Sequence, residues 1–256
     1  MIEAWSAWVC SAEFLSAWSI IAVAVFCFLF WFPAPYGRHT KVGWGPLISA
    51  QLGWIGMEAV TLVGFGLCFF ARPDYSPAGL LFVLLYGGHY LYRSFIYPFL
   101  SSASAAPVPL VIVLSAFFFN IFNSTILGGW LYVVGPAPET LSLSSASSIG
   151  GLILFCSGFA IHFSADRTLR NLRKVNGPGY HIPKGGLYRL VSCPNYLGEL
   201  LQWTGLAVMV SAPAVWTFVL WTAANLIPRA VRHHRWYRER FSDYPAERRA
   251  LIPGLL

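Results

Sequence analysis

Long apolar segments recur along the whole chain, and they constrain its fold more than any other feature. A helix needs roughly 20 apolar residues to cross a bilayer, whereas a barrel strand needs only about ten alternating ones. Composition agrees, because 57% of the residues are hydrophobic and 11% are charged, against about 25% charged in soluble domains. The sequence therefore predicts an all-α integral membrane protein, with seven transmembrane helices in a single domain over residues 1–256. The expected spans are about 11–32, 47–71, 78–98, 107–134, 146–166, 195–212 and 214–228.

The last two spans are separated by Ser211, Ala212 and Pro213. Proline breaks the hydrogen-bond ladder inside a helix. We interpret this stretch as a tight hairpin between two short spans, and one long kinked helix is the alternative.

The basic residues gather in three regions that seven spans would place on one side of the membrane. These regions are the link after the first span, the loop 167–194 and the C-terminal segment 229–256. Cytoplasmic loops are enriched in Lys and Arg, so we expect the N-terminus outside and the C-terminus in the cytoplasm. The residues are Arg38, Lys41, Arg167, Arg170, Arg173, Lys174, Lys184, Arg189, Arg229, Arg232, Arg235, Arg238, Arg240, Arg248 and Arg249.

The net charge of +7 has two interpretations. In the first, the basic residues only set the orientation of the chain in the membrane. In the second, they also bind a cytoplasmic anionic ligand such as a nucleotide phosphate. We do not expect nucleic acid as a partner, because the basic residues flank membrane spans and no recognition motif is present.

The motifs of common soluble enzymes are missing. There is no H-E-x-x-H and no G-x-S-x-G, and residue 69 is Phe where Gly64 and Gly66 would need a third glycine for G-x-G-x-x-G. We therefore expect no metal site and no Rossmann domain, so that a nicotinamide cofactor would have to bind in another way. Five scattered cysteines without a C-x-x-C pair favour core thiols over disulfides.

Charged side chains inside membrane spans are costly and tend to mark function. Glu58 lies near the middle of the second expected span, and Tyr86, Tyr90, Arg93 and Tyr97 share one face of the third. In a cavity, a neutral Glu58 could donate a hydrogen bond. The alternatives are a protonated Glu58 that bonds only a neighbouring helix, and a tyrosine belt at the membrane interface.

Three further polar faces lie toward the expected cytoplasmic side. Amides and carboxylates there suit hydroxyl and carboxamide groups, and arginine suits bidentate contacts with phosphate. The alternatives are bonds between helices, solvated ion pairs, and a basic helix lying on anionic lipid. The first face consists of Asn195, Glu199 and Gln202, and the second of Asp166, Arg170 and Arg173. The third consists of Arg229, His233, either Trp236 or Tyr237, and Arg240.

Five blocks carry a resemblance to a known family. They are PYGRHT (35–40), HYLYRSFIYPFL (89–100), the D-x-x-L-R-x-L-R-K pattern (166–174), YHIPKGGLYRLVSCPNYLGELLQW (180–203) and RHHRWYRERFSDYPAERRALIP (232–253). In order and spacing they resemble the steroid 5α-reductases, the 3-oxo-5α-steroid 4-dehydrogenases, over nearly the whole chain from residue 33. The sequence looks like a bacterial member, which would lie in the cell inner membrane.

The resemblance implies an NADPH-dependent reductase with seven transmembrane helices, which reduces the C4–C5 double bond of 3-oxo-Δ4 steroids. Glu58 and Tyr90 match the pair that holds the steroid ketone. We expect a monomer whose lipid substrate enters from the bilayer. The positions that match the cofactor site are Asn123, Asp166, Arg170, Arg173, Tyr180, Asn195, Glu199, Arg229, His233 and Tyr237.

Other functions stay open. The chain departs from the family pattern at Met57, where glutamine is usual, and at His162, where asparagine is usual. CPNYLGE is also similar to blocks in isoprenylcysteine carboxyl methyltransferases, which use S-adenosylmethionine. Reduction of another lipid enone or enoyl thioester is a further alternative, and so is a non-catalytic sterol-binding or transport protein.

Overall fold

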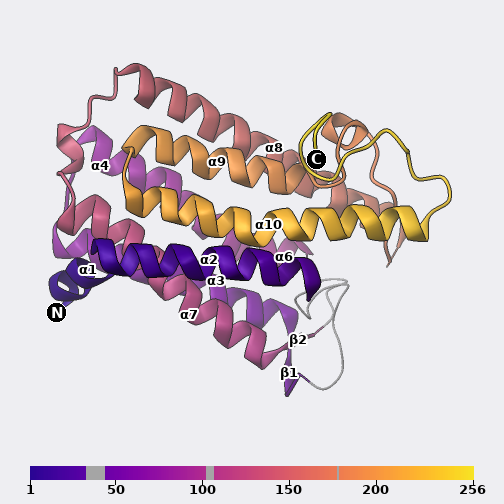
Figure 1. Cartoon of the computed structure of the whole chain (residues 1–256), viewed down its shortest axis with the longest axis horizontal. Helices are drawn as coiled ribbons and strands as arrows, with labels where there is room; N and C mark the ends of the chain where they lie inside the picture. Colours follow the sequence, from indigo (N-terminus) through magenta and orange to yellow (C-terminus); the bar gives the residue numbers. More distant parts are fainter. Residues whose placement is uncertain (33–43, 102–106, 178) are drawn as a thin grey trace. The chain divides into compact units, whose positions relative to one another are not determined.

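The computed structural model describes residues 1–32, 44–101, 107–177 and 179–256, and most of them are helical (Figure 1). The sheet found among these residues is one antiparallel pair, β1 (Leu47–Ile48) with β2 (Val108–Pro109), so this part of the chain contains no Rossmann-type sheet. Within the described ranges, five helices are long and apolar enough to cross a membrane, which supports a multi-pass membrane protein. They are α2 (Ala12–Trp31), α3 (Ala50–Ala71), α7 (Leu110–Gly128) continued by the π-helical η5 (Gly129–Val134), α8 (Ala146–Asn176) and α10 (Pro213–Arg240).

The other two expected spans are also helical, but they are short or irregular. At 17 residues, α9 (Pro194–Val210) is slightly shorter than the roughly 20 that a span needs. The third expected span is a run of short α- and π-helical pieces. Seven spans and the orientation of the termini therefore stay predictions. The pieces are α4 (Pro77–Phe82), η2 (Val83–Gly87), α5 (Gly88–Leu91), η3 (Tyr92–Ile96) and α6 (Tyr97–Ser101).

The chain divides into two compact units, and each is described by itself. The first contains Met1–Trp18, Ala34–Leu143 and Pro213–Val215, and the second contains Ser19–Pro33, Ser144–Ala212 and Trp216–Leu256. A single transmembrane domain stays a prediction. The PYGRHT block and Lys41 lie outside the described residues.

In the first unit, α3 and α7 pack closely because glycines face small side chains. A Cβ atom added to Gly64 would overlap Ser124, and one added to Gly128 would lie 3.0 Å from the Cβ of Cys68. Helix α1 (Ile2–Val9) joins this group, since Trp5 Nε1 donates to Thr125 Oγ1 at 3.0 Å. Small residues of this kind let membrane helices approach one another.

In the second unit, two pairs of glycines bring α8 and α9 into backbone contact. Gly151 and Gly158 lie two turns apart on α8, and Gly198 and Gly205 lie two turns apart on α9. A Cβ atom added to Gly158 would lie 2.5 Å from the backbone O of Gly198, and one added to Gly151 would lie 2.6 Å from that of Gly205. Any larger residue at these positions would push the helices apart.

Two helices, rather than one kinked helix, follow Cys193. Helix α9 ends at Val210 and is followed by Ser211, whose φ of 53° is left-handed; α10 begins at Pro213 and runs back along α9 (Figure 1). The rings of Trp203 and Phe218 lie 5.0 Å apart across this hairpin. Helix α10 continues to Arg240 and α8 to Asn176, so both extend beyond the spans expected from the apolar runs.

The C-terminal segment is bound to the residues just before α9. Arg249 N donates to Leu190 O at 2.9 Å, and Ser192 N donates to Arg249 O at 2.8 Å. The short helix η7 (Gly186–Arg189) follows Gly185. The φ of Gly185 is 88°, a conformation that glycine adopts more easily than other residues. This arrangement fixes the backbone from which α9 starts.

Candidate functional site

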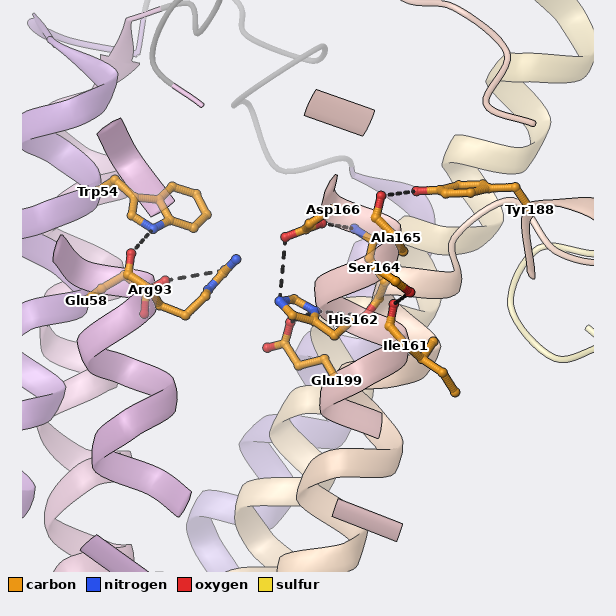
Figure 2. A network of polar contacts seen from close by, with 11 residues as sticks. Trp54, Glu58, Arg93, Ile161, His162, Ser164, Ala165, Asp166, Tyr188 and Glu199 are labelled. Atoms are coloured by element: carbon orange, nitrogen blue, oxygen red, sulfur yellow. Dashed lines mark hydrogen bonds and ion pairs between the residues drawn. The ribbon is translucent and has the colours of Figure 1, made fainter. Parts of the chain in front are cut away.

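Four polar side chains meet where α8 passes α9, and we call them the α8–α9 cluster. His162 Nε2 lies 3.6 Å from Asp166 Oδ2, and His162 Nδ1 lies 3.8 Å from Glu199 Oε2 (Figure 2). His162 Nδ1 is also 3.1 Å from the backbone O of Asn195, and Asn195 Nδ2 donates to Asp166 Oδ1 at 3.3 Å. A Cβ atom on Gly198 would overlap the backbone N of His162. The glycine contacts therefore position this cluster.

The α8–α9 cluster is largely hidden from solvent. His162 is 2% exposed and Asp166 is 5% exposed, and Gln202, one turn further along α9 than Glu199, is fully buried. Asp166 Oδ2 makes no hydrogen bond to a residue that the structure describes. Removing a carboxylate from water costs several kcal/mol unless it is paired. The cluster thus has spare capacity to accept hydrogen bonds from the hydroxyl or amide groups of a ligand.

Tyr188 of η7 lies beside this cluster. Its buried hydroxyl donates to the backbone O of Ala165 at 3.3 Å (Figure 2). Burial, and after it the charge of Asp166, raises the pKa of Tyr188 well above its ordinary value. The hydroxyl therefore stays a neutral donor and holds the backbone next to Asp166.

Two arginines lie further along α8, between the cluster and the C-terminal end of the helix. The guanidinium of Arg170 lies 5.9 Å from the centre of the Phe163 ring, and Arg173 is half-buried in the last turn of α8. Cations are favourable at the C-terminal end of a helix. They give this end of α8 a positive charge suited to phosphate.

Helix α10 adds a second basic and aromatic group. The guanidinium of Arg229 lies 5.5 Å from the Tyr196 ring, and the ring of His233 lies 5.7 Å from it. Tyr196 follows Asn195 on α9, so it links these two residues to the helix that carries the cluster.

The predicted tyrosines lie near the loop before η7. Tyr237 is buried, and its Oη donates to the backbone O of His181 at 3.4 Å. Tyr180 is 38% exposed, and its ring lies 5.1 Å from that of Trp236. Nine of the ten predicted cofactor-binding residues thus belong to the second unit.

The tenth, Asn123, belongs to the first unit. It is 2% exposed, and its Oδ1 accepts a hydrogen bond from Trp18 Nε1 at 3.3 Å. Its role in cofactor binding stays a prediction.

Glu58 in the first unit has a cationic partner. Its Oε1 lies 3.8 Å from Arg93 Nη2 (Figure 2). The Arg93 guanidinium lies 4.8 Å from the centre of the Trp54 ring and 4.9 Å from that of Tyr97, and Trp54 Nε1 donates to the backbone O of Arg93 at 3.1 Å. We call this group the Glu58–Arg93 pair. Sequence analysis considered an uncharged Glu58 and did not predict its contact with Arg93.

Tyr90 lies in the irregular helical run of the same unit. It is 8% exposed, and its ring lies 4.7 Å from that of Tyr86, which is fully buried. The π-helical turns η2 and η3 flank the short helix that carries Tyr90, and such turns often occur at functional sites. A joint role of Tyr90 and Glu58 stays a prediction.

Some residues near these groups were missed or not assigned a role by sequence analysis. Arg93 and His162 were noted for their residue type but not counted as site residues. Arg248 is 4% exposed; its Nη2 donates to the backbone O of Pro183 at 3.0 Å, and its guanidinium lies 5.1 Å from the Tyr244 ring. The two-turn spacing of glycines in α8 and α9 was a usable signal for the close contact.

Among the described residues, no group of three or more His, Cys, Asp or Glu side chains is arranged to hold a metal.

Comparison with known proteins places the chain in a family. Residues 106–256 match the family model of 3-oxo-5-alpha-steroid 4-dehydrogenase. The chain is 38% identical over 242 residues to steroid 5-alpha-reductase DET2 of Gossypium hirsutum, covering 91% of this chain and 93% of that protein. It is 40% identical over 227 residues to DET2 of Arabidopsis thaliana (86% and 87% covered) and 37% identical over 226 residues to 3-oxo-5-alpha-steroid 4-dehydrogenase 2 of Rattus norvegicus (86% and 87% covered). These relatives are from plants and mammals and give no support to a bacterial origin. The chain belongs to the 3-oxo-5-alpha-steroid 4-dehydrogenase family.

Proposed function

We propose that this chain reduces the C4–C5 double bond of 3-oxo-Δ4 steroids with NADPH as the reductant. The observation that carries the proposal is 38% identity to a steroid 5-alpha-reductase over 91% of the chain. The polar side chains held inside apolar helices supply groups suited to this chemistry. Each unit provides one set of them.

In the first unit, the Tyr90 hydroxyl and the Glu58 carboxyl in its protonated form would donate hydrogen bonds to the steroid C3 ketone, because an ionised carboxylate can only accept them. Hydrogen bonds to this oxygen draw electron density away from C5, and they strengthen as negative charge builds on the oxygen. The Arg93 guanidinium lies 3.8 Å from Glu58 and contacts the Trp54 and Tyr97 rings, and its positive charge would further stabilise the negative oxygen. Donors in a site that excludes water act more strongly than they would in water.

In the second unit, the available groups fit a phosphorylated dinucleotide. The acceptor capacity of Asp166 suits a ribose hydroxyl or carboxamide, and Glu199 and Asn195 lie beside it. Arg170, Arg173 and Arg229 suit phosphates. NADPH, when bound, would supply the hydride that adds at C5.

We also propose the finer membrane arrangement that the basic residues favour. It has seven spans, the N-terminus outside and the C-terminus in the cytoplasm. The apolar steroid would then enter from the bilayer, and the charged cofactor would enter from the cytoplasm. Reporter fusions at residues 140 and 256 should report opposite sides, and signals from the same side would contradict this arrangement.

The decisive experiment incubates the purified chain with NADPH and a panel of Δ4-3-ketosteroids, with products identified by mass spectrometry. We expect a 5α-reduced product, a gain of two hydrogen atoms. A lipid enone and an enoyl thioester in parallel reactions test the other reductions. Transfer of a methyl group from S-adenosylmethionine to an isoprenylated cysteine, without steroid reduction, would contradict the proposal. Steroid binding without any product would also contradict it.

A further inference from the structure

Helix α10 has a basic face on the side opposite to its residues of the candidate site. Val231, His234, Arg235 and Arg238 are spaced i, i+3, i+4 and i+7, so they share this face. Together with Glu239 they line a groove of about 480 Å³. This volume lies within the range of sites that bind small molecules. We call this feature the α10 groove.

The α10 groove carries positive charge without a counterion. Arg235 and Arg238 are exposed, and neither guanidinium forms an ion pair or a hydrogen bond with a residue that the structure describes. Glu239 supplies one negative charge, which leaves the groove positive. The His234 ring is held in place, since its Nδ1 lies 2.7 Å from Ser192 Oγ. Arginine makes bidentate contacts with phosphate, so two unpaired guanidiniums one turn apart suit a phosphate group.

Helix α2 belongs to the same unit as α10 and runs in the same direction (Figure 1). Ser19 Oγ lies 3.5 Å from Thr217 Oγ1, and further along both helices Arg232 Nε donates to Leu29 O at 2.9 Å. Arg232 also donates to Phe30 O. The last carbonyls of a helix have no partner within the helix, and a cation is favourable there. Arg232 is therefore level with the end of α2.

The end of α2 marks the depth of the α10 groove in the bilayer. Trp31 and Phe32 are 78% and 60% exposed there, and aromatic residues gather at membrane interfaces. Arg235 and Arg238 lie about 4.5 Å and 9 Å beyond Arg232 at the helical rise, and their side chains lean back toward α2. The headgroup layer is roughly 5–8 Å thick on each side of the hydrocarbon. The groove therefore lies at the depth of the lipid phosphates.

We propose that the α10 groove binds the headgroup of an anionic phospholipid. Arg235 and Arg238 hold its phosphate, and Glu239 accepts a hydrogen bond from a headgroup hydroxyl. Val231 lies nearest the hydrocarbon and contacts the apolar part of the lipid. The bound lipid stabilises the helix whose other side carries part of the candidate site. This inference is independent of the proposed steroid chemistry and of the cofactor.

The test compares phosphatidylglycerol, which is anionic and carries hydroxyls, with the neutral phosphatidylcholine. Native mass spectrometry of the purified full chain in detergent measures the affinity for each lipid. The wild type should bind phosphatidylglycerol on the order of tenfold more tightly, because each arginine near an anionic lipid surface adds to binding. The double variant Arg235→Gln, Arg238→Gln should lose this preference. The matched control Arg167→Gln, Arg189→Gln removes two exposed arginines outside the groove and should keep it.

Thermal unfolding with each lipid added is the second measurement. Phosphatidylglycerol should raise the Tm of the wild type and of the control more than phosphatidylcholine does, and it should not do so for the groove variant. Since both groove arginines are exposed and bond no described residue, the variant should fold. If it does not, Arg238→Gln takes its place, with a smaller expected loss of preference.

Three outcomes would overturn the inference. Equal affinity of the wild type for the two lipids shows that the groove does not select an anionic headgroup. Equal loss of preference in the groove variant and in the control shows only a general attraction between basic residues and anionic lipid. A groove variant that keeps its lipid preference but binds NADPH more weakly than the control shows a nucleotide phosphate site instead. Failure of the wild type to bind NADPH overturns the proposed function and leaves the lipid site standing.

Discussion

The Glu58–Arg93 pair and the α8–α9 cluster both hold charged groups in apolar helices, but they do so in different ways. The pair is surrounded by aromatic rings and includes a residue from a π-helical turn. The cluster stands on two regular α-helices whose glycines bring their backbones together. Aromatic faces can tilt and slide, whereas backbone contact allows little adjustment. Under the proposed function, we therefore expect the first unit to accommodate steroids of varied shape and the second to hold one cofactor rigidly.

The first way to test this contrast is to remove the groups proposed to act on the ketone. Tyr90→Phe and Glu58→Leu should each lower steroid turnover about 100- to 1000-fold, because each removes a donor to the charged transition state. The affinity for NADPH should change little. Turnover and NADPH affinity are measured on the same purified variants.

Glu58→Gln is the matched control, since its amide still donates, and it should keep partial activity. Near-normal turnover in both Tyr90→Phe and Glu58→Leu would remove the pair from the mechanism. Loss of NADPH binding in these variants would show that the two units do not divide the chemistry as proposed.

The second prediction addresses the glycine contacts. Gly158→Ala should destabilise the chain by about 1–3 kcal/mol, because its Cβ would lie 2.5 Å from Gly198 O. Gly150→Ala, on the same helix with no atom within 4 Å of its added Cβ, should be neutral or slightly stabilising. Thermal unfolding in detergent compares the two variants. Equal stability would mean that α8 and α9 adjust freely, and the contrast between rigid and adaptable regions would fail.

Sequence analysis predicted the features that depend on local pattern. The apolar runs predicted the helices α2, α3 and α8, and the spacing of Asn195 and Glu199 placed them one turn apart on α9. The spacing of residues along one helix does not show which other helix its polar face contacts. The pairing of Gly158 with Gly198 is tertiary information, and so is the contact between Arg93 and Glu58.

Helix irregularity was a second limit on prediction from sequence. The third expected span was interpreted with the α-helical period, in which Tyr86, Tyr90 and Arg93 share a face. The structure contains π-helical turns at Val83–Gly87 and Tyr92–Ile96, which add a residue to the turn and rotate the next part of the helix about its axis. The predicted ends of α8 and α10 were also too early. Both helices continue through polar sequence, where no apolar pattern marks them.

The third prediction tests whether the second unit recognises the cofactor phosphate. Arg173→Ala should weaken NADPH binding about tenfold while changing NADH binding much less, since a hydrogen bond to a charged group contributes about 1.5–3 kcal/mol. Lys174→Ala removes a neighbouring charge on the same helix and is the control. Binding titrations with both nucleotides give the comparison. An equal loss for NADPH and NADH would show that Arg173 does not contact the 2′-phosphate.

The smallest expected effect comes from the aromatic surroundings of Arg93. Trp54→Leu removes both the ring 4.8 Å from the guanidinium and the donor to Arg93 O. Since a cation–π contact contributes about 0.5–2 kcal/mol, we expect steroid turnover to fall roughly fivefold. Trp54→Phe keeps an aromatic face but loses the N–H donor, so its turnover should fall less, and that smaller fall should isolate the effect of the hydrogen bond.

Turnover across a series of steroids of different shape is the measurement. If Trp54→Leu keeps wild-type rates for every steroid, the rings do not position Arg93. If instead bulky steroids lose rate more than small ones, the aromatic surroundings act on substrate shape, as the contrast between the two regions requires.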